Sequence, residues 1–223
     1  LWLKLNWKNS VNTSKAIVTT SNFVREDIIS RYGKDQRIIT IHIPIEINEN
    51  DVVPFGEIQK TYNIYFKEFY YTVSSLLPHK NLITLINIMK TIRDKKINLP
   101  NKLLISGIGG KDKDLLFDMI KEYDLGDNVI LTGFVDNSIR NTLYKSCRTF
   151  LFPSIFEGFG MPPVEAMAFG GYVITTKKTS IYEVTQGKAK YVNDPYDIDE
   201  WINCMLDDKE YNRIDLSNSD NCL

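Results

Sequence analysis

Two glutamates flank a glycine-rich turn in the stretch PSIFEGFGMPPVEAMAFGG, which covers residues 153–171. Glu157 and Glu165 stand eight positions apart, with Gly158 and Gly160 between them. Two carboxylates at this spacing could work as a general acid and base, or they could hold the hydroxyl groups of one elongated ligand. Each could instead cap a helix, because carboxylates are common at helix amino termini. The spacing alone leaves these interpretations open.

Prolines directly after the turn predict that a helix begins there. Pro162 or Pro163 fits the first turn of a helix, where the missing amide hydrogen is not needed, and this also places Glu165 in the first turn. The glycines before the helix let the backbone approach a ligand closely. Free amide groups and the positive end of the helix dipole favour a phosphate or diphosphate at this point. Glu165 could accept hydrogen bonds from a diol such as ribose, and Glu157 would address the opposite part of the ligand.

These residues need a scaffold, and the chain supplies eight short β-rich runs with helical patterns between them. The alternation predicts an α/β fold in which helices wrap a doubly wound, Rossmann-like parallel sheet. Apolar residues at helical spacing predict crossover helices over 82–92, 112–124 and 137–147. The β-rich runs are 16–21, 37–43, 69–76, 102–107, 128–134, 149–154, 172–176 and 189–193.

In an open parallel sheet, ligands bind in the crevice beyond the carboxyl ends of the strands. Clusters of candidate residues follow four of the predicted strands: 74–80, 107–110, 133–134 and the stretch with the two glutamates. Short loops often need glycine for their own turns, but four clusters at one edge favour a binding site. Two carboxylates beside a diphosphate require a cation, and Lys80 is the candidate. The alternative for Lys80 is an ordinary surface lysine at a helix start.

The segment 46–66 breaks the alternation with polar residues, a proline and a glycine, and this predicts a linker. We therefore divide the chain into a remnant of an amino-terminal domain at 1–50, a linker at 51–66 and a doubly wound domain at 67–223. The chain begins without Met, within a predicted structural element, so we expect it to be a fragment.

Composition indicates an ordinary folded protein, with 223 residues, 43% hydrophobic and 25% charged residues, and a net charge of -1. This balance gives no global attraction to nucleic acid. No run of about 18 apolar residues is present, so no transmembrane helix is expected. Cys147, Cys204 and Cys222 lack CxxC spacing, and their odd number suits a reducing compartment such as the cytoplasm. Lys and Arg outnumber Asp and Glu in residues 1–40, which leaves open a peripheral contact of the full-length protein with the inner face of a membrane.

Other chemistries are poorly supported. The stretch SGIGGKD lacks the third glycine of a dinucleotide fingerprint, and no GxxxxGK followed by Ser or Thr is present. His42 and His79 are the only histidines, which argues against a histidine-rich metal site and against a Ser/His/Asp arrangement. The DKD run at 112–114 could hold a divalent cation, but its position at a helix start favours capping. We expect neither a metal nor another cofactor.

The stretch FEGFGMPPVEAMAFGGYVI resembles the signature of the retaining family-4 glycosyltransferases, also called glycosyl transferases group 1, which have the GT-B architecture and the hallmark Glu, seven residues, Glu. VTTSNFVREDIISRYG resembles the segment that closes the family's amino-terminal domain, and VSSLLPHKNL resembles the first strand and loop of its carboxyl-terminal domain. ISGIGG and LTGFV are similar to its nucleotide-binding turns, and TSIYEV and YVNDPYDID to its closing segments. The resemblance implies the carboxyl-terminal, donor-binding half of a GT-B enzyme with a remnant of the other half.

The resemblance implies a role for each matching residue. Glu165 would hold the ribose hydroxyls of a nucleotide-sugar donor, and Glu157 would hold hydroxyls of the transferred sugar. Lys80 would stabilise the charge on the leaving diphosphate, so that Glu157 and Lys80 form the catalytic pair. The residues implied in donor binding are Glu165, Gly158, Phe159, Gly160, Met161, Ser75, Gly107, Gly109, Phe134 and Val135.

The implied reaction transfers a hexosyl unit to an acceptor hydroxyl, with retention at the anomeric carbon and without metal. We expect a UDP- or GDP-sugar as donor, and a glycan, glycolipid or polysaccharide as acceptor, including lipid-linked glycans. A cytoplasmic enzyme is expected, in accord with the cysteine pattern.

Several residues depart from the family pattern. Ser75 stands where many members have Arg, and Ser74 where they have Gly, which puts one diphosphate contact in doubt. Tyr172 stands where Pro is usual, and no helix that crosses back to the amino-terminal domain is evident after Leu206. With the acceptor-binding domain almost absent, we expect the chain to bind a nucleotide sugar but to transfer little. The alternatives are a non-catalytic nucleotide-binding module of the same fold and, less favoured, a sugar-nucleotide epimerase.

Overall fold

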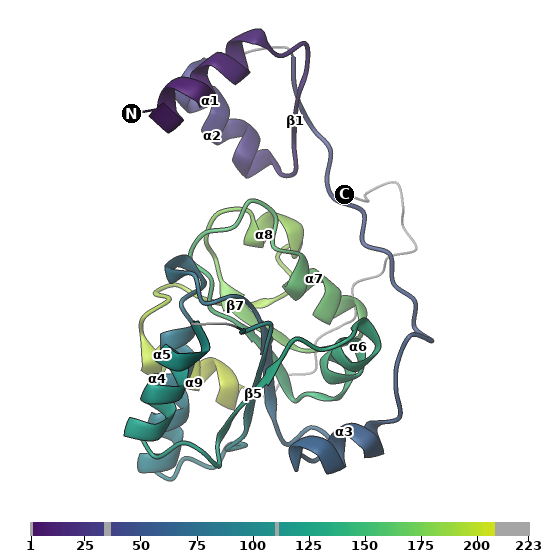
Figure 1. Cartoon of the computed structure of the whole chain (residues 1–223), viewed down its shortest axis with the longest axis vertical. Coiled ribbons are helices and arrows are strands. Elements are labelled where there is room, and N and C mark those ends of the chain that lie inside the picture. Colours follow the sequence, from purple (N-terminus) through teal and green to yellow (C-terminus); the bar gives the residue numbers. More distant parts are fainter. Residues whose placement is uncertain (1, 34–36, 110–111, 208–223) are drawn as a thin grey trace.

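The computed structural model of the chain describes residues 2–33, 37–109 and 112–207. A small amino-terminal lobe sits above a larger α/β domain in Figure 1, and an extended segment, residues 41–54, joins them. The small lobe contains α1 Trp2–Thr13, β1 Ile17–Thr19, α2 Asn22–Tyr32 and β2 Ile38–Thr40.

In the small lobe, two short parallel strands pack against α2. β1 and β2 pair with Val18 opposite Ile39. α2 begins after Ser21, because Ser21 Oγ accepts the amide hydrogen of Val24 and so satisfies one of the free donors at the helix start. α2 ends at Tyr32, and its C-cap is Gly33, whose φ of 91° suits glycine. The N-cap at Ser21 also brings this residue to the surface that faces the larger domain.

The larger domain is built on a sheet of six parallel strands in the order β5-β4-β3-β6-β7-β8. This order confirms the predicted doubly wound α/β fold, since the sheet grows outward in both directions from β3. The strand order reverses between β3 and β6, which is the place where such sheets bind ligands. The strands are β3 Tyr70–Val73, β4 Leu103–Ser106, β5 Val129–Gly133, β6 Thr149–Phe152, β7 Val173–Thr176 and β8 Lys190–Val192.

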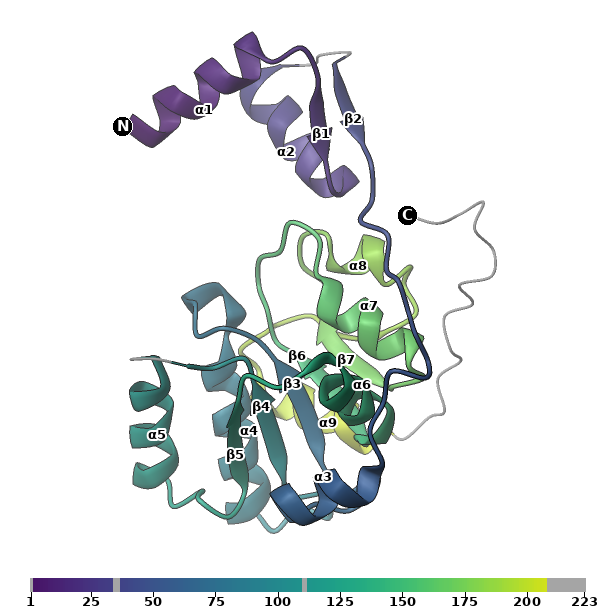
Figure 2. The ribbon, with the colours of Figure 1, turned by 45° about the vertical axis from the view of Figure 1, so that its right-hand side comes forward.

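Helices cover both faces of the sheet (Figure 2). One face carries α4 Leu82–Asp94, α5 Asp112–Glu122 and α9 Ile198–Leu206. The other face carries α3 Phe55–Tyr62, α6 Asn137–Ser146, α7 Met161–Ala168 and α8 Ile181–Val184.

Alternation along the strands divides the apolar residues between two cores. Tyr70, Leu103 and Ile105 point into the core under α4, α5 and α9. Tyr71 and Leu104, their neighbours in sequence, point into the core under α3, α6, α7 and α8. Because both faces are buried, the strands read as continuous apolar runs in the sequence.

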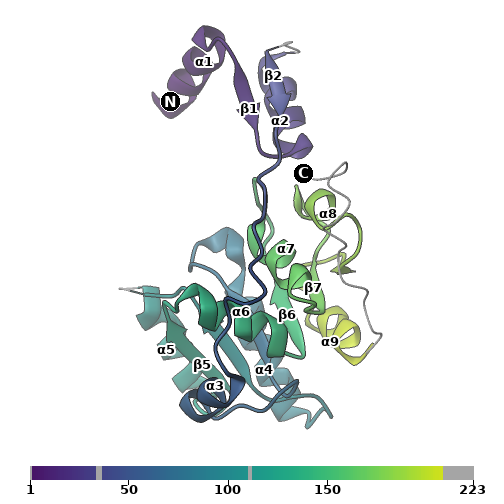
Figure 3. The ribbon, with the colours of Figure 1, turned by 90° about the vertical axis from the view of Figure 1, so that its right-hand side faces the viewer.

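The extended segment that joins the lobe to the domain runs along α6 (Figure 3). Val53 N donates to Thr142 Oγ1 over 2.9 Å, and Asn141 Nδ2 donates to Asp51 O over 2.9 Å. Side chains of α6 therefore satisfy backbone groups of a segment that pairs with no strand among the described residues.

The predicted linker at 51–66 contains α3. Ile58, in α3, and Ile64, just after this helix, are buried in the core of the larger domain. Burial of these apolar side chains ties this part of the linker to the domain. The three-part division of the chain stays a prediction, and residues 208–223 of its last part lie outside the described ranges.

Candidate functional site

The loops after β3 and β6 meet at the point where the strand order reverses. The loop after β3 contains a 3-10 helix, Pro78–Lys80, that ends with Lys80. Lys80 Nζ lies 2.7 Å from Glu157 Oε1, and the two side chains are 19% and 11% exposed. The structure thus brings together the cation and one of the carboxylates that sequence reasoning singled out.

Glu157 lies in the turn that leads into α7. Gly160 is the N-cap of α7 with a φ of 96°, which glycine adopts without strain. Because this left-handed residue starts the helix at Met161, Glu165 lies in the second turn, and its predicted place in the first turn is wrong. No acidic residue stands in the first turn of α7, so the capping interpretation of Glu165 is excluded. Proline does stand in the first turn, as predicted.

Two residues that sequence reasoning missed hold the Glu165 carboxylate. The Tyr144 hydroxyl donates to Glu165 Oε2 over 2.8 Å, and Arg140 Nη2 lies 3.7 Å from Glu165 Oε1. Burial raises the pKa of Tyr144, and the charge of Glu165 raises it further, so the phenol stays protonated and donates. Arg140 and Tyr144 lie one turn apart on α6, but nothing in the sequence connects that face to α7.

Glycines allow the loops after β3, β4 and β5 to approach one another. Gly107 has a φ of 87°, and a Cβ added there would lie 2.7 Å from Ser74 O. A Cβ added at Gly109 would lie 2.8 Å from the ring of Phe134, which is 82% exposed. The expected convergence of these loops at one edge of the sheet is therefore present, and the close approach to the Ser74 backbone requires glycine at position 107.

The remaining predicted site residues differ in what they can offer a ligand. Phe159 is 5% exposed, and its ring packs 6.3 Å from the ring of His42, so only its backbone could contact a donor. Met161 is exposed at the start of α7. Ser75 is exposed in the loop after β3, and Val135 is half-buried in the loop after β5.

The amino-terminal lobe also reaches the turn between the two glutamates. Ser21 Oγ donates to Gly158 O over 2.7 Å, and Thr20 Oγ1 lies 3.2 Å from the same oxygen. The ring of Phe23 packs edge-on against that of Phe156, with 6.0 Å between the centroids. The candidate site is therefore built by both parts of the chain.

Glu183 in α8 anchors the small lobe to the domain. Its carboxylate accepts the amide hydrogens of Asn22 and Phe23 over 2.7 and 3.1 Å, and His42 Nε2 lies 2.7 Å away. Burial raises the pKa of Glu183, but the hydrogen bonds from His42 and the two amides outweigh it and hold the pKa below its usual value of 4.5.

Acid should release this anchor. Because the pKa of Glu183 is lower in the folded than in the unfolded chain, its contribution to stability is complete above pH 4.5 and is lost as the pH falls through the folded-state value. We expect the difference in melting temperature between wild type and Glu183→Gln to be constant above about pH 5 and to shrink toward zero by about pH 3. Thermal unfolding over this range measures the difference, and growth of the difference in acid would contradict the assignment.

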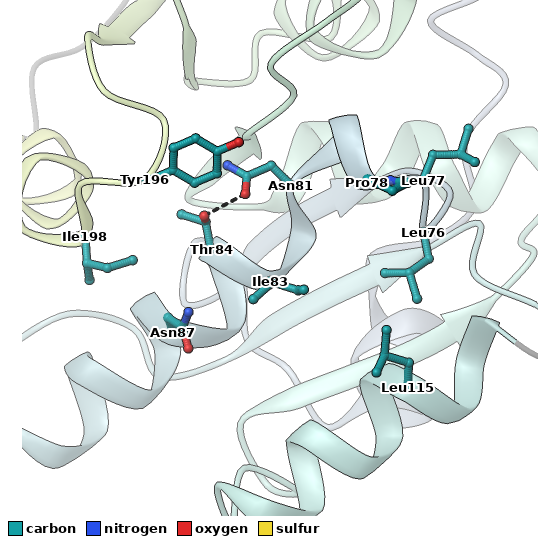
Figure 4. A pocket seen from close by; sticks show the side chains of 10 residues that line it. All are labelled: Leu76, Leu77, Pro78, Asn81, Ile83, Thr84, Asn87, Leu115, Tyr196 and Ile198. Atoms are coloured by element: carbon teal, nitrogen blue, oxygen red, sulfur yellow. Dashed lines mark hydrogen bonds between the residues drawn. The ribbon is translucent and has the colours of Figure 1, made fainter.

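A separate cavity of about 460 Å³ lies between α4, α5 and the loop before α9 (Figure 4). Asn81 Nδ2 donates to Pro153 O and Pro195 O, and Thr84 Oγ1 donates to Asn81 Oδ1, so these polar groups in its wall are already engaged. None of the described residues that line it is charged, so the cavity does not suit a diphosphate. It is lined by Leu76, Leu77, Pro78, Asn81, Ile83, Thr84, Asn87, Leu115, Tyr196 and Ile198.

Among the residues that the structure describes, no group of three or more His, Cys, Asp or Glu side chains could hold a metal ion. The expected lack of a metal stays a prediction. Cys147 and Cys204 are buried, and burial raises the pKa of the Cys147 thiol to about 12, which suits a structural role; Cys222 lies outside the described residues. Within the described ranges, no helix combines the length and the apolar character needed to cross a membrane.

Residues 56–214 match the family model described as "Glycosyl transferases group 1". O-antigen chain mannosyltransferase B of Escherichia coli is 27% identical over 205 residues, which cover 89% of this chain and 52% of the relative. O-antigen chain mannosyltransferase RfbU of Salmonella typhimurium is 32% identical over 196 residues, which cover 87% of this chain and 51% of the relative. The chain spans about half the length of these curated relatives.

Two solved structures share the fold. Anabaena Alr3699/HepE in complex with UDP and glucose superimposes with a TM-score of 0.76 at 18% identity, over 92% of this chain and 57% of that protein. The crystal structure of TarM superimposes with a TM-score of 0.72 at 21% identity, over 91% of this chain and 38% of that protein. At these identities the likeness concerns the fold alone.

Proposed function

We propose, from the premise that this chain belongs to the glycosyl transferases group 1 family, that it forms the donor-binding half of an enzyme that moves a sugar from a nucleotide sugar to an acceptor hydroxyl. The observation that carries the proposal is the ion pair between Lys80 and Glu157 beside the turn that leads to Glu165. A cation, a turn with free amides and a second carboxylate suit the charges and hydroxyls of one elongated donor.

Each group would meet a different part of the donor. The two ribose hydroxyls would donate to Glu165, whose carboxylate is already oriented by Tyr144. Hydroxyls of the sugar would donate to Glu157. The diphosphate would lie over the amides that precede α7, where the helix dipole favours negative charge, and Lys80 would exchange part of its contact with Glu157 for a phosphate oxygen.

The proposed chemistry is transfer with retention. The acceptor hydroxyl would attack the anomeric carbon on the face from which the diphosphate departs. Negative charge grows on the leaving phosphate as the glycosidic bond breaks, and Lys80 together with the amides of the turn would stabilise that charge. Both glutamates would position the donor, and neither need act as a nucleophile, which separates this site from the paired carboxylates of glycoside hydrolases.

The comparisons favour particular substrates. Both curated relatives described above bear the name O-antigen chain mannosyltransferase, so mannose is the favoured sugar and a glycan chain, free or lipid-linked, the favoured acceptor. The HepE structure contains UDP, and a UDP- or GDP-sugar is the proposed donor class. Action at the inner face of a membrane would bring the enzyme to a lipid-linked acceptor.

Calorimetric titration of the chain with UDP-, GDP- and ADP-sugars tests this function. We expect saturable binding of at least one nucleotide sugar and weaker or no binding of the corresponding free sugar, because most of the proposed contacts are made to the nucleotide. We also expect little or no transfer by the chain alone. Failure of every nucleotide sugar to bind would contradict the donor site, and rapid turnover by the chain alone would contradict its assignment as half of an enzyme.

A non-catalytic nucleotide-binding module with the same fold is less well supported. Such a module would have no use for a carboxylate beside the sugar, yet Glu157 is held by Lys80 at the edge of the sheet. Loss of nucleotide-sugar binding with retained nucleoside diphosphate binding in Glu157→Gln would favour the enzyme over the module.

A further inference from the structure

Two serine hydroxyls lie within hydrogen-bonding distance of the three carbonyl oxygens of the turn between Glu157 and Gly160. Ser180 Oγ lies 2.9 Å from Glu157 O and 2.8 Å from Phe159 O, so its single hydrogen is shared between these two acceptors. Ser21 Oγ donates to Gly158 O over 2.7 Å. Both serine side chains are buried, so water does not compete for these hydrogen bonds.

A carbonyl group that is fixed by a hydrogen bond also fixes the direction of the following amide N–H. In a trans peptide the C=O and the following N–H point in opposite directions within one plane. Holding the carbonyls of residues 157, 158 and 159 therefore sets the directions of the amides of Gly158, Phe159 and Gly160. Within the part of the chain that the structure describes, these three amides donate no hydrogen bond. They are the donors that the proposed site would offer to a diphosphate or sugar.

The middle carbonyl differs from the other two, because its hydroxyl partners come from the amino-terminal lobe. Ser21 and Thr20 lie between β1 and α2, whereas Ser180 belongs to the larger domain. The lobe is kept in place beside the turn by the contacts of Glu183 with the start of α2 and with His42. The hydroxyl contacts of this carbonyl are thus present only while the lobe stays docked.

The hydroxyl contacts on the Gly158 carbonyl matter because glycine has more backbone freedom than other residues. Gly158 has no side chain that limits its backbone, and a Cβ added there would meet Val24 Cγ2 only at 3.8 Å, so side-chain packing at this point comes from the next residue, Phe159, whose ring is buried. Without the hydroxyls, a ligand would have to order this part of the turn at the expense of its affinity. With them, the turn is ordered before the ligand arrives.

We infer that Ser21 and Thr20 are positioning residues that couple the amino-terminal lobe to the donor site through the carbonyl of Gly158. The inference rests on the proposed function, because it concerns the same turn. On this inference, the affinity for the donor depends on the docking of the lobe, because the hydroxyls of Ser21 and Thr20 orient the peptide that carries the Phe159 amide.

Four variants separate positioning from folding. Ser21→Gly removes the hydroxyl at a position where glycine is a tolerated N-cap, so α2 is kept. Ser21→Thr retains a hydroxyl and should therefore keep the order of residues 158–160 and the affinity for the probe. Thr20→Val is isosteric and removes the weaker, 3.2 Å contact. Ser30→Ala is the matched control, because Ser30 lies on α2, the helix that Ser21 caps, and its hydroxyl donates to Asp27 O and to no other described residue.

Nitrogen-15 relaxation of the amides of residues 158–160 is the direct readout. In wild type, Ser21→Thr and Ser30→Ala we expect order parameters of about 0.85, and in Ser21→Gly values that fall toward about 0.6 at Phe159, with a smaller fall in Thr20→Val. UDP and GDP serve as binding probes, and the probe that binds wild type should bind Ser21→Gly about five- to tenfold more weakly.

Unchanged order parameters at 158–160 in both Ser21→Gly and Thr20→Val would overturn the inference. Unchanged probe affinity in Ser21→Gly would overturn it as well. The relaxation measurement needs no ligand, so it decides the inference even if neither probe binds wild type. Such a lack of binding would count against the proposed function alone.

Discussion

Glu165→Ala should lower the affinity of the chain for its nucleoside diphosphate about 10- to 100-fold, since hydrogen bonds to a charged group contribute about 1.5–3 kcal/mol. The carboxylate is held by the Tyr144 hydroxyl at 2.8 Å, so it would meet the ribose of the proposed donor without first having to be ordered. Calorimetric titration with UDP and GDP measures the loss.

The same substitution leaves a buried phenol without its acceptor. Tyr144 is fully buried, so Glu165→Ala should also lower the free energy of unfolding by about 1–3 kcal/mol. Glu165→Gln keeps an acceptor for Tyr144 and separates the two effects, because it should retain stability while binding more weakly. Glu68→Ala is the matched control, since Glu68 is exposed just before β3, at the opposite edge of the sheet. Unchanged nucleotide affinity in Glu165→Ala would show that the residue does not hold the donor.

Lys80→Ala should have the second large effect, a loss of about 100-fold in affinity for the nucleoside diphosphate, because the proposed charge-assisted contact with phosphate would be lost in a site with little solvent. The variant also leaves the Glu157 carboxylate, whose side chain is 11% exposed, without its cation. This should lower the free energy of unfolding by about 2 kcal/mol. Lys90→Ala is the matched control: Lys90 pairs with Asp94 on the surface of α4, where an ion pair contributes less than about 1 kcal/mol.

The partner substitution, Glu157→Gln, should act in the opposite sense on the diphosphate. It frees Lys80 from its ion pair, so UDP or GDP should bind as well as before or better, while the nucleotide sugar loses its sugar contact and binds more weakly. Parallel titrations of both ligands into both variants measure this. Equal losses for nucleotide and nucleotide sugar in Glu157→Gln would contradict the assignment of Glu157 to the sugar.

Much of the fold could be predicted because the signals are local. Each β-rich run contains a strand, and parallel strands buried on both faces read as apolar runs. The structural neighbours confirm the expected GT-B type of domain. α3 was missed because Pro54 and Gly56 suggested a linker, whereas Pro54 is the N-cap of this helix and Gly56 its second residue.

The site could be predicted only in part, because only some of its features are determined by residues that are neighbours in the sequence. The turn around Gly160 and the prolines of α7 are encoded within a few residues, and they were predicted. The contacts that orient them connect distant positions: Tyr144 and Glu165 are 21 residues apart, and Ser21 and Gly158 are 137 apart. Such pairs arise from tertiary packing, which one sequence does not reveal.

The central claim is that the two glutamates hold opposite ends of one donor, and a crystal structure of the chain with a bound nucleotide sugar tests it most directly. We predict ribose hydroxyls within hydrogen-bonding distance of Glu165, the diphosphate over the amides that precede α7 and beside Lys80, and the sugar against Glu157. A donor bound with its ribose at Glu157, or bound in the cavity beside α4 and away from both glutamates, would contradict the claim.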